Sequence, residues 1–172
     1  MNDESIERIL DPIESFIVGT IGAPGEREFF LQVKFHGGIH SFAIEKGQVS
    51  ALADRLAVLI GELKAADYRF ENLIQTNFEV PLIPEFQVGT ISIIWLEESE
   101  QVLIELQQIA QMEEANPDIT QLFKLFMSAD IANNFISQSR KVVAAGRLPC
   151  PFCGLPINSN GHLCPRANGY RR

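Results

Sequence analysis

The chain has 172 residues, of which 46% are hydrophobic and 21% charged, and its formal net charge is −8 at pH 7. This balance is typical of a folded globular protein and excludes an intrinsically disordered one. A chain of this length usually forms one domain, or one domain with a small appendage.

Neither a membrane span nor an export signal is predicted. The most apolar run, around residues 91–96, is far shorter than the roughly 20 residues that a transmembrane helix needs. The N-terminal stretch MNDESIERIL is acidic, whereas a secretory signal begins with basic residues and continues with an apolar region. We therefore expect a cytoplasmic protein without a membrane partner.

The first half of the chain predicts three strands and a helix. In a strand, successive residues fall on opposite faces. One face of REFFLQVKF carries Phe29, Leu31, Val33 and Phe35, and the other carries Phe30, Gln32 and Lys34. The pair Gly37-Gly38 is typical of a hairpin turn. A helical spacing of apolar residues follows, formed by Val49, Leu52, Leu56, Leu59, Ile60 and Leu63. The expected elements are strands over 16–21, 27–35 and 39–46 and a helix over 47–64.

A near-repeat indicates that the second half copies the first. FQVGTI at 86–91 agrees with FIVGTI at 16–21 in five of six positions, and the same order of elements follows each copy. The alternative is convergence on common strand sequences. Gly19 and Gly89, inside these segments, indicate bulges or a close approach of another part of the chain. The second-half elements are strands over 86–99, 101–109 and 119–127 and a helix over 129–145.

The ends of the second helix carry recognisable signals. Ser128 is a typical N-cap, and Asp130 stands in the first turn, where the helix dipole favours a carboxylate. Gly146 is expected to adopt the left-handed conformation after the last turn, and Pro149 prevents continuation.

These elements predict an α+β fold of internally duplicated β-β-β-α units, with antiparallel sheets, packed helices and a small C-terminal zinc-binding lobe. The body spans residues 1–146, with repeat halves over about 13–65 and 83–146. The lobe spans residues 147–172. The connector between the halves is expected to carry a short helix or an extended piece.

Charge is distributed unevenly along the chain. From Ile131 onward there is no Asp or Glu, while Arg140, Lys141, Arg147, Arg166, Arg171 and Arg172 contribute +6. The preceding residues hold 8 Lys and Arg against 22 Asp and Glu, so 8 − 22 = −14. Two interpretations follow: the basic segment packs on the acidic body of its own or a neighbouring chain, or it contacts a phosphate-bearing or acidic partner.

All three cysteines lie in CPFCGLPINSNGHLCPR, residues 150–166. Cys150 and Cys153 form one close pair, and His162 and Cys164 form a second after a short loop. Three thiolates and one imidazole are a common closed ligand set for tetrahedral Zn²⁺. An odd number of cysteines without an export signal argues against a disulfide framework. We therefore predict a zinc site formed by these four residues.

Two other roles for the cysteines stay open. A CxxC dithiol can act in redox chemistry, but that arrangement usually starts a helix, and the sequence GLPINSNG after Cys153 cannot continue as one. A catalytic zinc needs an open coordination position, which would exist if His162 were not a direct ligand.

The sequence resembles an uncharacterised bacterial family, found mainly in actinobacteria, that ends in CPxCGxPxxxxGHxCPRxNGYRR. The resemblance rests on CPFCGLPINSNGHLCPRANGYRR, FIVGTIGAPGEREFFLQ and EKGQVSALADRL, and it covers the full length. By position, it places Cys150, Cys153, His162 and Cys164 on the Cys/His pattern and Arg166, Asn168, Gly169 and Tyr170 on the segment after it. The resemblance implies no activity.

Three functions are compatible with this sequence. The first is a non-catalytic binding or adaptor protein, with a protein partner or self-association, whose zinc is structural. The second is a nucleic-acid or phosphate-ligand binder, in which Tyr170 stacks and the acidic body disfavours a long polyanion. Its contact residues would be Arg147, Arg166, Asn168, Tyr170, Arg171 and Arg172. The third is an enzyme with a site between the halves or at the metal; no catalytic residue is assigned.

Overall fold

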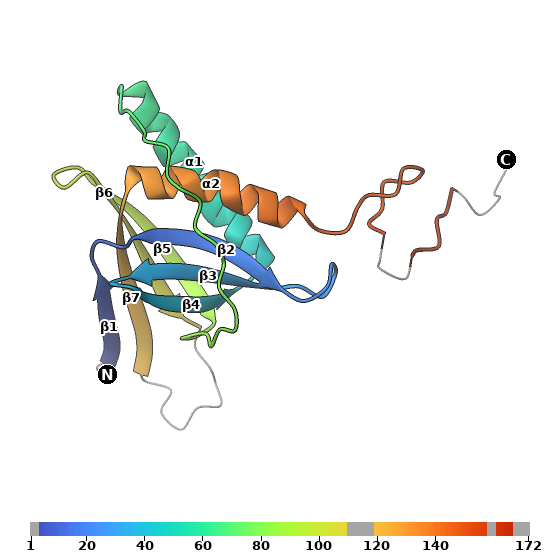
Figure 1. Ribbon diagram of the computed structural model, residues 1–172, viewed down its shortest axis with the longest axis horizontal. Coiled ribbons are helices and arrows are strands. Elements are labelled where there is room, and N and C mark those ends of the chain that lie inside the picture. Colours follow the sequence, from blue (N-terminus) through green and yellow to red (C-terminus); the bar gives the residue numbers. More distant parts are fainter. Residues whose placement is uncertain (1–3, 110–118, 158–160, 167–172) are drawn as a thin grey trace.

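Seven strands and two helices form the body in the computed structural model, which describes residues 4–109, 119–157 and 161–166 (Figure 1). The first part contains β1 (Glu4–Leu10), β2 (Ser15–Ile21), β3 (Glu28–Phe35), β4 (Gly38–Ile44) and α1 (Lys46–Ala65). The second contains β5 (Val88–Leu96), β6 (Gln101–Gln108), β7 (Ile119–Ser128) and α2 (Ala129–Ala144). The order β-β-β-α therefore occurs twice, as expected, after an additional first strand.

The strands form two sheets, and the α+β prediction is confirmed. One sheet is antiparallel in the order β2-β3-β4. The other has the order β1-β7-β6-β5 and is mixed, because β1 pairs in parallel with β7 while the remaining neighbours are antiparallel. The expectation of purely antiparallel sheets is thus corrected by β1, a strand that the sequence pattern did not predict.

The turn between β3 and β4 lies one residue earlier than expected. His36 and Gly37 form it, with φ values of 48° and 76°, and Gly38 already pairs with Phe35 as the first residue of β4. Two successive positive φ values are typical of the tight turn whose twist matches that of a hairpin. Glycine is required at one of these positions because it adopts positive φ without steric cost.

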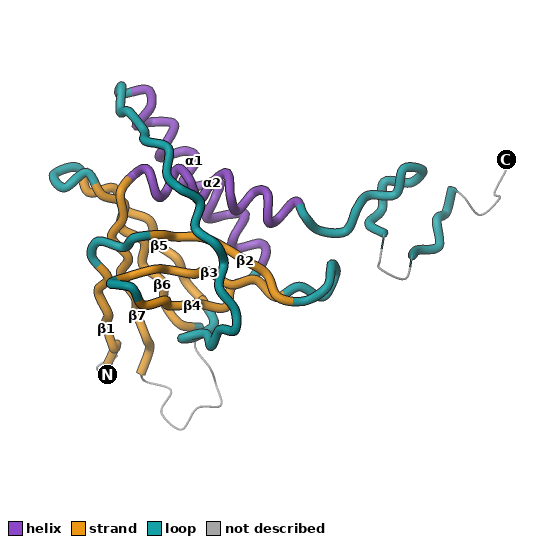
Figure 2. Tube along the Cα trace, in the orientation of Figure 1, coloured by secondary structure: helices purple, strands orange, loops and turns teal. Residues whose placement is uncertain are grey.

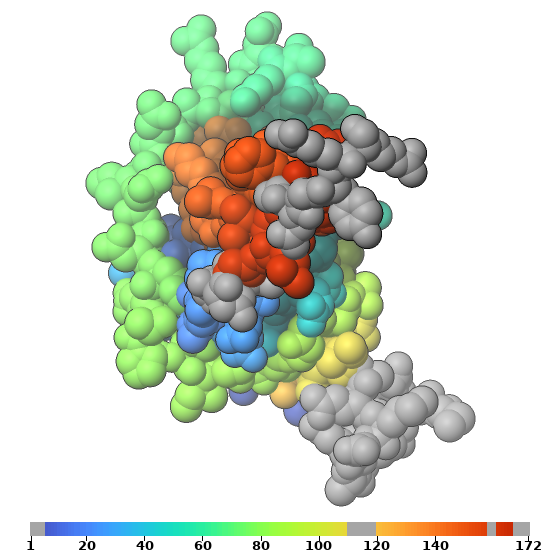
Figure 3. All heavy atoms as spheres, turned by 90° about the vertical axis from the view of Figure 1, so that its right-hand side faces the viewer, coloured from blue at the N-terminus to red at the C-terminus, as the bar shows by residue number. Residues whose placement is uncertain are grey.

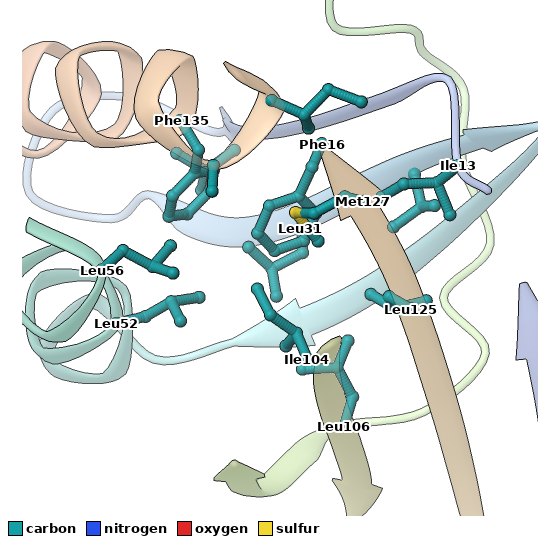
Figure 4. Packing of buried hydrophobic residues seen from close by; sticks show 14 of the residues in the cluster. Ile13, Phe16, Leu31, Leu52, Leu56, Ile104, Leu106, Leu125, Met127 and Phe135 are labelled. Atoms are coloured by element: carbon teal, nitrogen blue, oxygen red, sulfur yellow. The ribbon is translucent and has the colours of Figure 1, made fainter. Parts of the chain in front are cut away.

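One hydrophobic core joins both sheets and both helices (Figure 4). Phe16 of β2 stacks on Phe135 of α2, with ring centroids 4.5 Å apart. Phe42 of β4 meets Phe123 of β7 edge to face at 5.0 Å. Figure 4 shows Leu52 and Leu56 of α1 directed toward the same cluster. The body of the chain therefore folds around apolar side chains from both halves.

Each helix binds the first strand of the other half. Gln48 of α1 donates from Nε2 to the carbonyl oxygens of Val88 and Gly89 in β5, at 3.2 and 2.9 Å. Gln138 of α2 donates from Nε2 to the carbonyl oxygen of Val18 in β2 at 2.6 Å and accepts from its N–H at 3.0 Å. Val18 and Val88 occupy the same position in the two near-identical hexapeptides. Each helix thus forms hydrogen bonds with the half of the chain to which it does not belong.

We expect Gln138→Ala to lower the free energy of unfolding by about 2 kcal/mol, because it leaves both polar backbone groups of Val18 without a partner. Val18 is fully buried, so its backbone N–H and carbonyl are shielded from bulk water in the folded state. Asn134→Ala is the control, since this residue of the same helix makes no side-chain hydrogen bond within the described part of the chain. Equal urea midpoints for the two variants would contradict the expectation.

The two hexapeptide glycines permit close approaches, as predicted. A Cβ on Gly19 would overlap the ring of Phe78. A Cβ on Gly89 would lie 2.8 Å from Cα of Ile109, and the pairing of β5 with β6 shifts between Val88 and Thr90. Gly89 therefore marks a β-bulge, whereas Gly19 accommodates an aromatic ring from the connector.

The connector over residues 66–87 is extended and lies across the antiparallel sheet (Figure 2). The backbone N–H of Glu71 donates to Asp130 Oδ1 in α2 at 2.7 Å. Further along, Gln32 of β3 exchanges two hydrogen bonds with the backbone of Glu79, at 2.8 and 2.9 Å. Because Gln32 is only 4% exposed, these bonds explain how a polar side chain is accommodated on the covered face of the sheet.

The start of α2 follows the prediction and its end does not. Ser128 Oγ accepts a hydrogen bond from the N–H of Ile131 at 3.3 Å, and Asp130 lies in the first turn. At the other end the prediction for Gly146 is wrong, because the glycines with positive φ in the described chain do not include it. The cap residue is Ala145, whose N–H donates to the carbonyl of Lys141 at 2.9 Å. This bond closes the last turn without a left-handed residue.

Candidate metal centre

The first cysteine pair lies in a tight hairpin that follows α2. Figure 1 shows this C-terminal segment projecting away from the body. The N–H of Ile157 donates to the carbonyl of Leu148 at 2.9 Å, and the N–H of Cys150 donates to that of Leu155 at 2.7 Å. Gly154, with φ of 74°, then donates its N–H to the carbonyl of Cys150 at 2.8 Å. This turn brings the side chains of Cys150 and Cys153 to one side, and glycine is needed there because of its positive φ.

The second pair is brought beside the first by the returning chain. Gly161, with φ of 84°, precedes His162 and lets the chain bend there. Arg166 donates from Nη1 to the carbonyl of Phe152 at 3.2 Å and so joins the two halves of the segment. The four residues expected to bind metal therefore come together in space.

The donor atoms have the spacing of a tetrahedral metal site. The Sγ atoms of Cys150, Cys153 and Cys164 and a ring nitrogen of His162 all lie within 4.8 Å of one another. Sγ of Cys150 is 3.7 Å from Sγ of Cys164, and Sγ of Cys153 is 3.3 Å from His162 Nε2. Tetrahedral bonds of about 2.3 Å place sulfurs about 3.8 Å apart, whereas a disulfide bond measures about 2.05 Å. The group could therefore hold a metal ion, and its three thiols are not oxidised to disulfides.

Backbone N–H groups direct positive charge at the sulfurs. Burial raises the pKa of the Cys150 thiol, but hydrogen bonds from the N–H groups of Cys153 and Phe152 outweigh it and hold this pKa below its ordinary value. For Cys153, a hydrogen bond from Leu155 lowers the pKa, while burial and the neighbouring sulfurs of Cys164 and Cys150 outweigh it and raise the pKa. The surroundings thus favour the thiolate form of Cys150 and disfavour that of Cys153, and a bound cation would compensate the negative charge of two neighbouring thiolates.

The described residues around the cluster, 147–157 and 161–166, form no apolar core of their own. Cys150 and Cys164 are buried, whereas Leu148 is 76% exposed and Leu163 is 86% exposed. Phe152 and Leu155 are also exposed. Because the large apolar side chains point outward, the hydrophobic effect contributes little to holding this segment together. A metal bound by the four donors would supply the missing stabilisation.

The structure separates the residues expected to contact a ligand. Arg147 lies at a cleft on the body beside Arg27 and Lys46, two residues that were not expected from the sequence to contact a ligand. Arg166 is exposed and bonded to Phe152 within the C-terminal segment. The remaining predicted contacts, Asn168, Tyr170, Arg171 and Arg172, lie outside the described residues.

Comparison with known proteins identifies the family of this chain. A family model described as "Protein of unknown function (DUF3090)" matches residues 9–164, a range that includes all four candidate ligands. The chain therefore belongs to this uncharacterised family, as the sequence indicated, whereas the family's distribution among bacteria and its C-terminal motif stay predictions. No curated protein and no solved structure matches the chain. Among the described residues, no helix is long and apolar enough to cross a membrane.

Proposed function

We propose that Cys150, Cys153, His162 and Cys164 hold a structural Zn²⁺ and that the protein is a non-catalytic binding module. The observation that carries this proposal is the convergence of three sulfurs and one imidazole nitrogen within 4.8 Å. This donor set suits zinc because thiolate and imidazole are borderline-soft ligands. Four protein donors complete a tetrahedral shell and leave no position for water or a substrate, and this favours a structural over a catalytic ion.

A two-part organisation supports this role. We assign residues 1–146 to a duplicated body with halves over about 13–65 and 83–146, and residues 147–172 to the zinc lobe. The repeated β-β-β-α order and the reciprocal contacts of Gln48 and Gln138 with equivalent strand positions support the duplication. A shared ancestor of the two halves accounts for these features together, whereas convergence would have to produce each separately.

The partner that we propose for the lobe is a second copy of this chain in the cytoplasm. The lobe projects from the body (Figure 1), and among its described residues Arg166, Leu163 and Phe152 are exposed. The part of the chain before Ile131 carries a charge of −14, from 8 Lys and Arg against 22 Asp and Glu. A basic lobe on an acidic neighbouring body provides charge complementarity, and Leu163 and Phe152 provide apolar contact area.

Native mass spectrometry of the full chain, purified without chelator, tests both parts of the proposal. We expect one zinc per chain and a dimer that dissociates as salt is raised, because screening weakens contacts between opposite charges. Leu163→Ser should shift the mass distribution to monomer while keeping the zinc. Ile74→Ser is the matched control, since Ile74 is 94% exposed but lies in the connector.

The two failures can be told apart. A zinc-free chain that still dimerises would disprove the metal assignment, while self-association through the lobe would remain supported. A zinc-loaded monomer at all concentrations, or equal dimer loss in the two variants, would disprove self-association through the lobe.

A further inference from the structure

A cleft of about 650 Å³ opens where three segments of the body meet. These segments are the β2–β3 turn, the start of α1 and the chain just after α2, and all three lie on the side from which the C-terminal segment leaves (Figure 1). Figure 3 views this side, with the C-terminal segment projecting toward the viewer. The volume lies within the range of roughly 300–1,000 Å³ that is typical of small-molecule sites. None of the four candidate metal ligands lines the cleft.

Three basic side chains from the three segments line this cleft. Arg27 comes from the β2–β3 turn, Lys46 is the first residue of α1, and Arg147 follows α2. A Cβ on Gly146 would lie 3.3 Å from Arg27 Nη2 and 3.8 Å from Lys46 Nζ, so both cations face the same point. Arg147 packs along Gly25, where its Cδ would lie 3.3 Å from an added Cβ.

Acidic side chains also line this cleft. Glu28 and Glu45 also line the cleft, so three positive side chains face two negative ones. Arg27 is held by a hydrogen bond from Nη1 to the carbonyl of Val142 at 3.1 Å and by the ring of Phe29, 5.1 Å from its guanidinium carbon. Lys46 Nζ has no hydrogen bond or ion pair with another residue in the described ranges. Like charges directed at one point repel each other, and an anion placed between them would be attracted to both and offset that repulsion.

An apolar wall lies beside the cations. Phe29 and Phe30 of β3 and Ile44 of β4 line the cleft with the small part of their surface that stays exposed, and the half-buried Leu82 of the connector lines it too. Such a surface offers contact area to the carbon skeleton of a ligand, whereas a free inorganic ion would leave it unused.

We propose that this cleft binds a small organic phosphate. The phosphate group would lie between Arg27, Lys46 and Arg147, and the organic part would lie along Phe29, Phe30 and Leu82. Guanidinium groups suit phosphate because their planar N–H donors match two of its oxygens, and a lysine adds a further charged hydrogen bond. Arg147 is three residues before Cys150, so a bound ligand would also fix the segment that joins body and lobe.

The experiment is a titration of the isotope-labelled, zinc-loaded full chain, followed by amide chemical shifts. The probes are phenyl phosphate, inorganic phosphate and phenol. We expect saturable shifts at Gly25, Lys46 and Gly146 with phenyl phosphate, weaker binding of inorganic phosphate, and no saturation with phenol. Lys46→Gln should weaken phenyl phosphate about tenfold, because it removes one charge-assisted hydrogen bond. Arg55→Gln, an exposed position on the same helix, removes the same charge and should change nothing.

Several results would overturn the proposal. One is the absence of saturation at about 10 mM phenyl phosphate, where a site with a Kd of about 1 mM would be mostly filled. Another is equal weakening by Lys46→Gln and Arg55→Gln, which would indicate a general charge effect. Shifts confined to the segment after Cys150 would place anion binding in the C-terminal lobe instead. Equal affinity for the two phosphates would disprove contact with the apolar wall. Because Lys46 is exposed, we expect Lys46→Gln to leave the body folded, and the amide spectrum of the variant should then match that of the wild type away from residue 46.

Discussion

Replacing Cys153 with serine is expected to abolish stoichiometric zinc binding and to unfold the C-terminal segment after Gly146, while the body stays folded. Sγ of Cys153 lies beside His162 Nε2, and thus connects the first ligand pair to the second. A serine hydroxyl is a harder and poorer donor for zinc than a thiolate. Without the ion, the outward-facing Leu148 and Leu163 cannot replace it with a core.

Elemental analysis for zinc and hydrogen exchange of backbone amides measure the two effects of Cys153→Ser. Amides after Gly146 should lose protection, and those of the strands and helices should keep theirs. Leu155→Ser is the matched control, because it lies two residues away, is 51% exposed and contributes no ligand atom. Unchanged zinc content in the cysteine variant would refute the ligand assignment.

Phe123→Ala is expected to lower the free energy of unfolding of the body by about 3–5 kcal/mol, the range for truncating a fully buried aromatic residue. Phe123 is completely buried in β7, with its ring 5.0 Å from that of Phe42 and 5.7 Å from that of Phe86. These neighbours belong to β4 and to the chain just before β5, so the ring joins the two sheets. Its removal would leave a cavity that a rigid sheet cannot close.

Urea unfolding of the full chain, followed by circular dichroism, measures the effect of Phe123→Ala. Phe152→Ala makes the same chemical change at a residue that is 64% exposed in the lobe, and we expect it to stay within about 0.5 kcal/mol of the wild type. A loss below about 1 kcal/mol for Phe123→Ala would mean that the two sheets do not share the core described above.

Most of the regular structure could be predicted because apolar periodicity records which face of each element is buried. Leu31 and Val33 in β3 and Leu52 and Leu56 in α1 are all buried, as their spacing indicated. β1 could not be found in this way. Its Ile6 and Ile9 are 49% and 56% exposed, and the strand forms through parallel pairing with β7, more than 100 residues later. Pairing of this kind depends on tertiary structure and leaves no local pattern.

The candidate metal centre could be predicted from the sequence, whereas the cleft could not, because only the metal ligands lie close together along the chain. Cysteine and histidine ligands lie close together in sequence because a small lobe must surround one ion, so their spacing alone indicated the cluster at Cys150 and Cys164. Arg27, Lys46 and Arg147 are distant in sequence and are united only by the fold. Arg147 was expected to contact a phosphate ligand. Arg27 and Lys46 were not, because lysine and arginine are common on protein surfaces and neither stands out before the structure is known.

X-ray absorption spectroscopy at the zinc edge of the purified full chain reports which atoms surround the metal. A structural site formed by Cys150, Cys153, His162 and Cys164 predicts three sulfur neighbours at about 2.3 Å and one nitrogen at about 2.0 Å from the metal. A first shell with a water oxygen or fewer than three sulfurs, or a protein that binds no zinc, would contradict it.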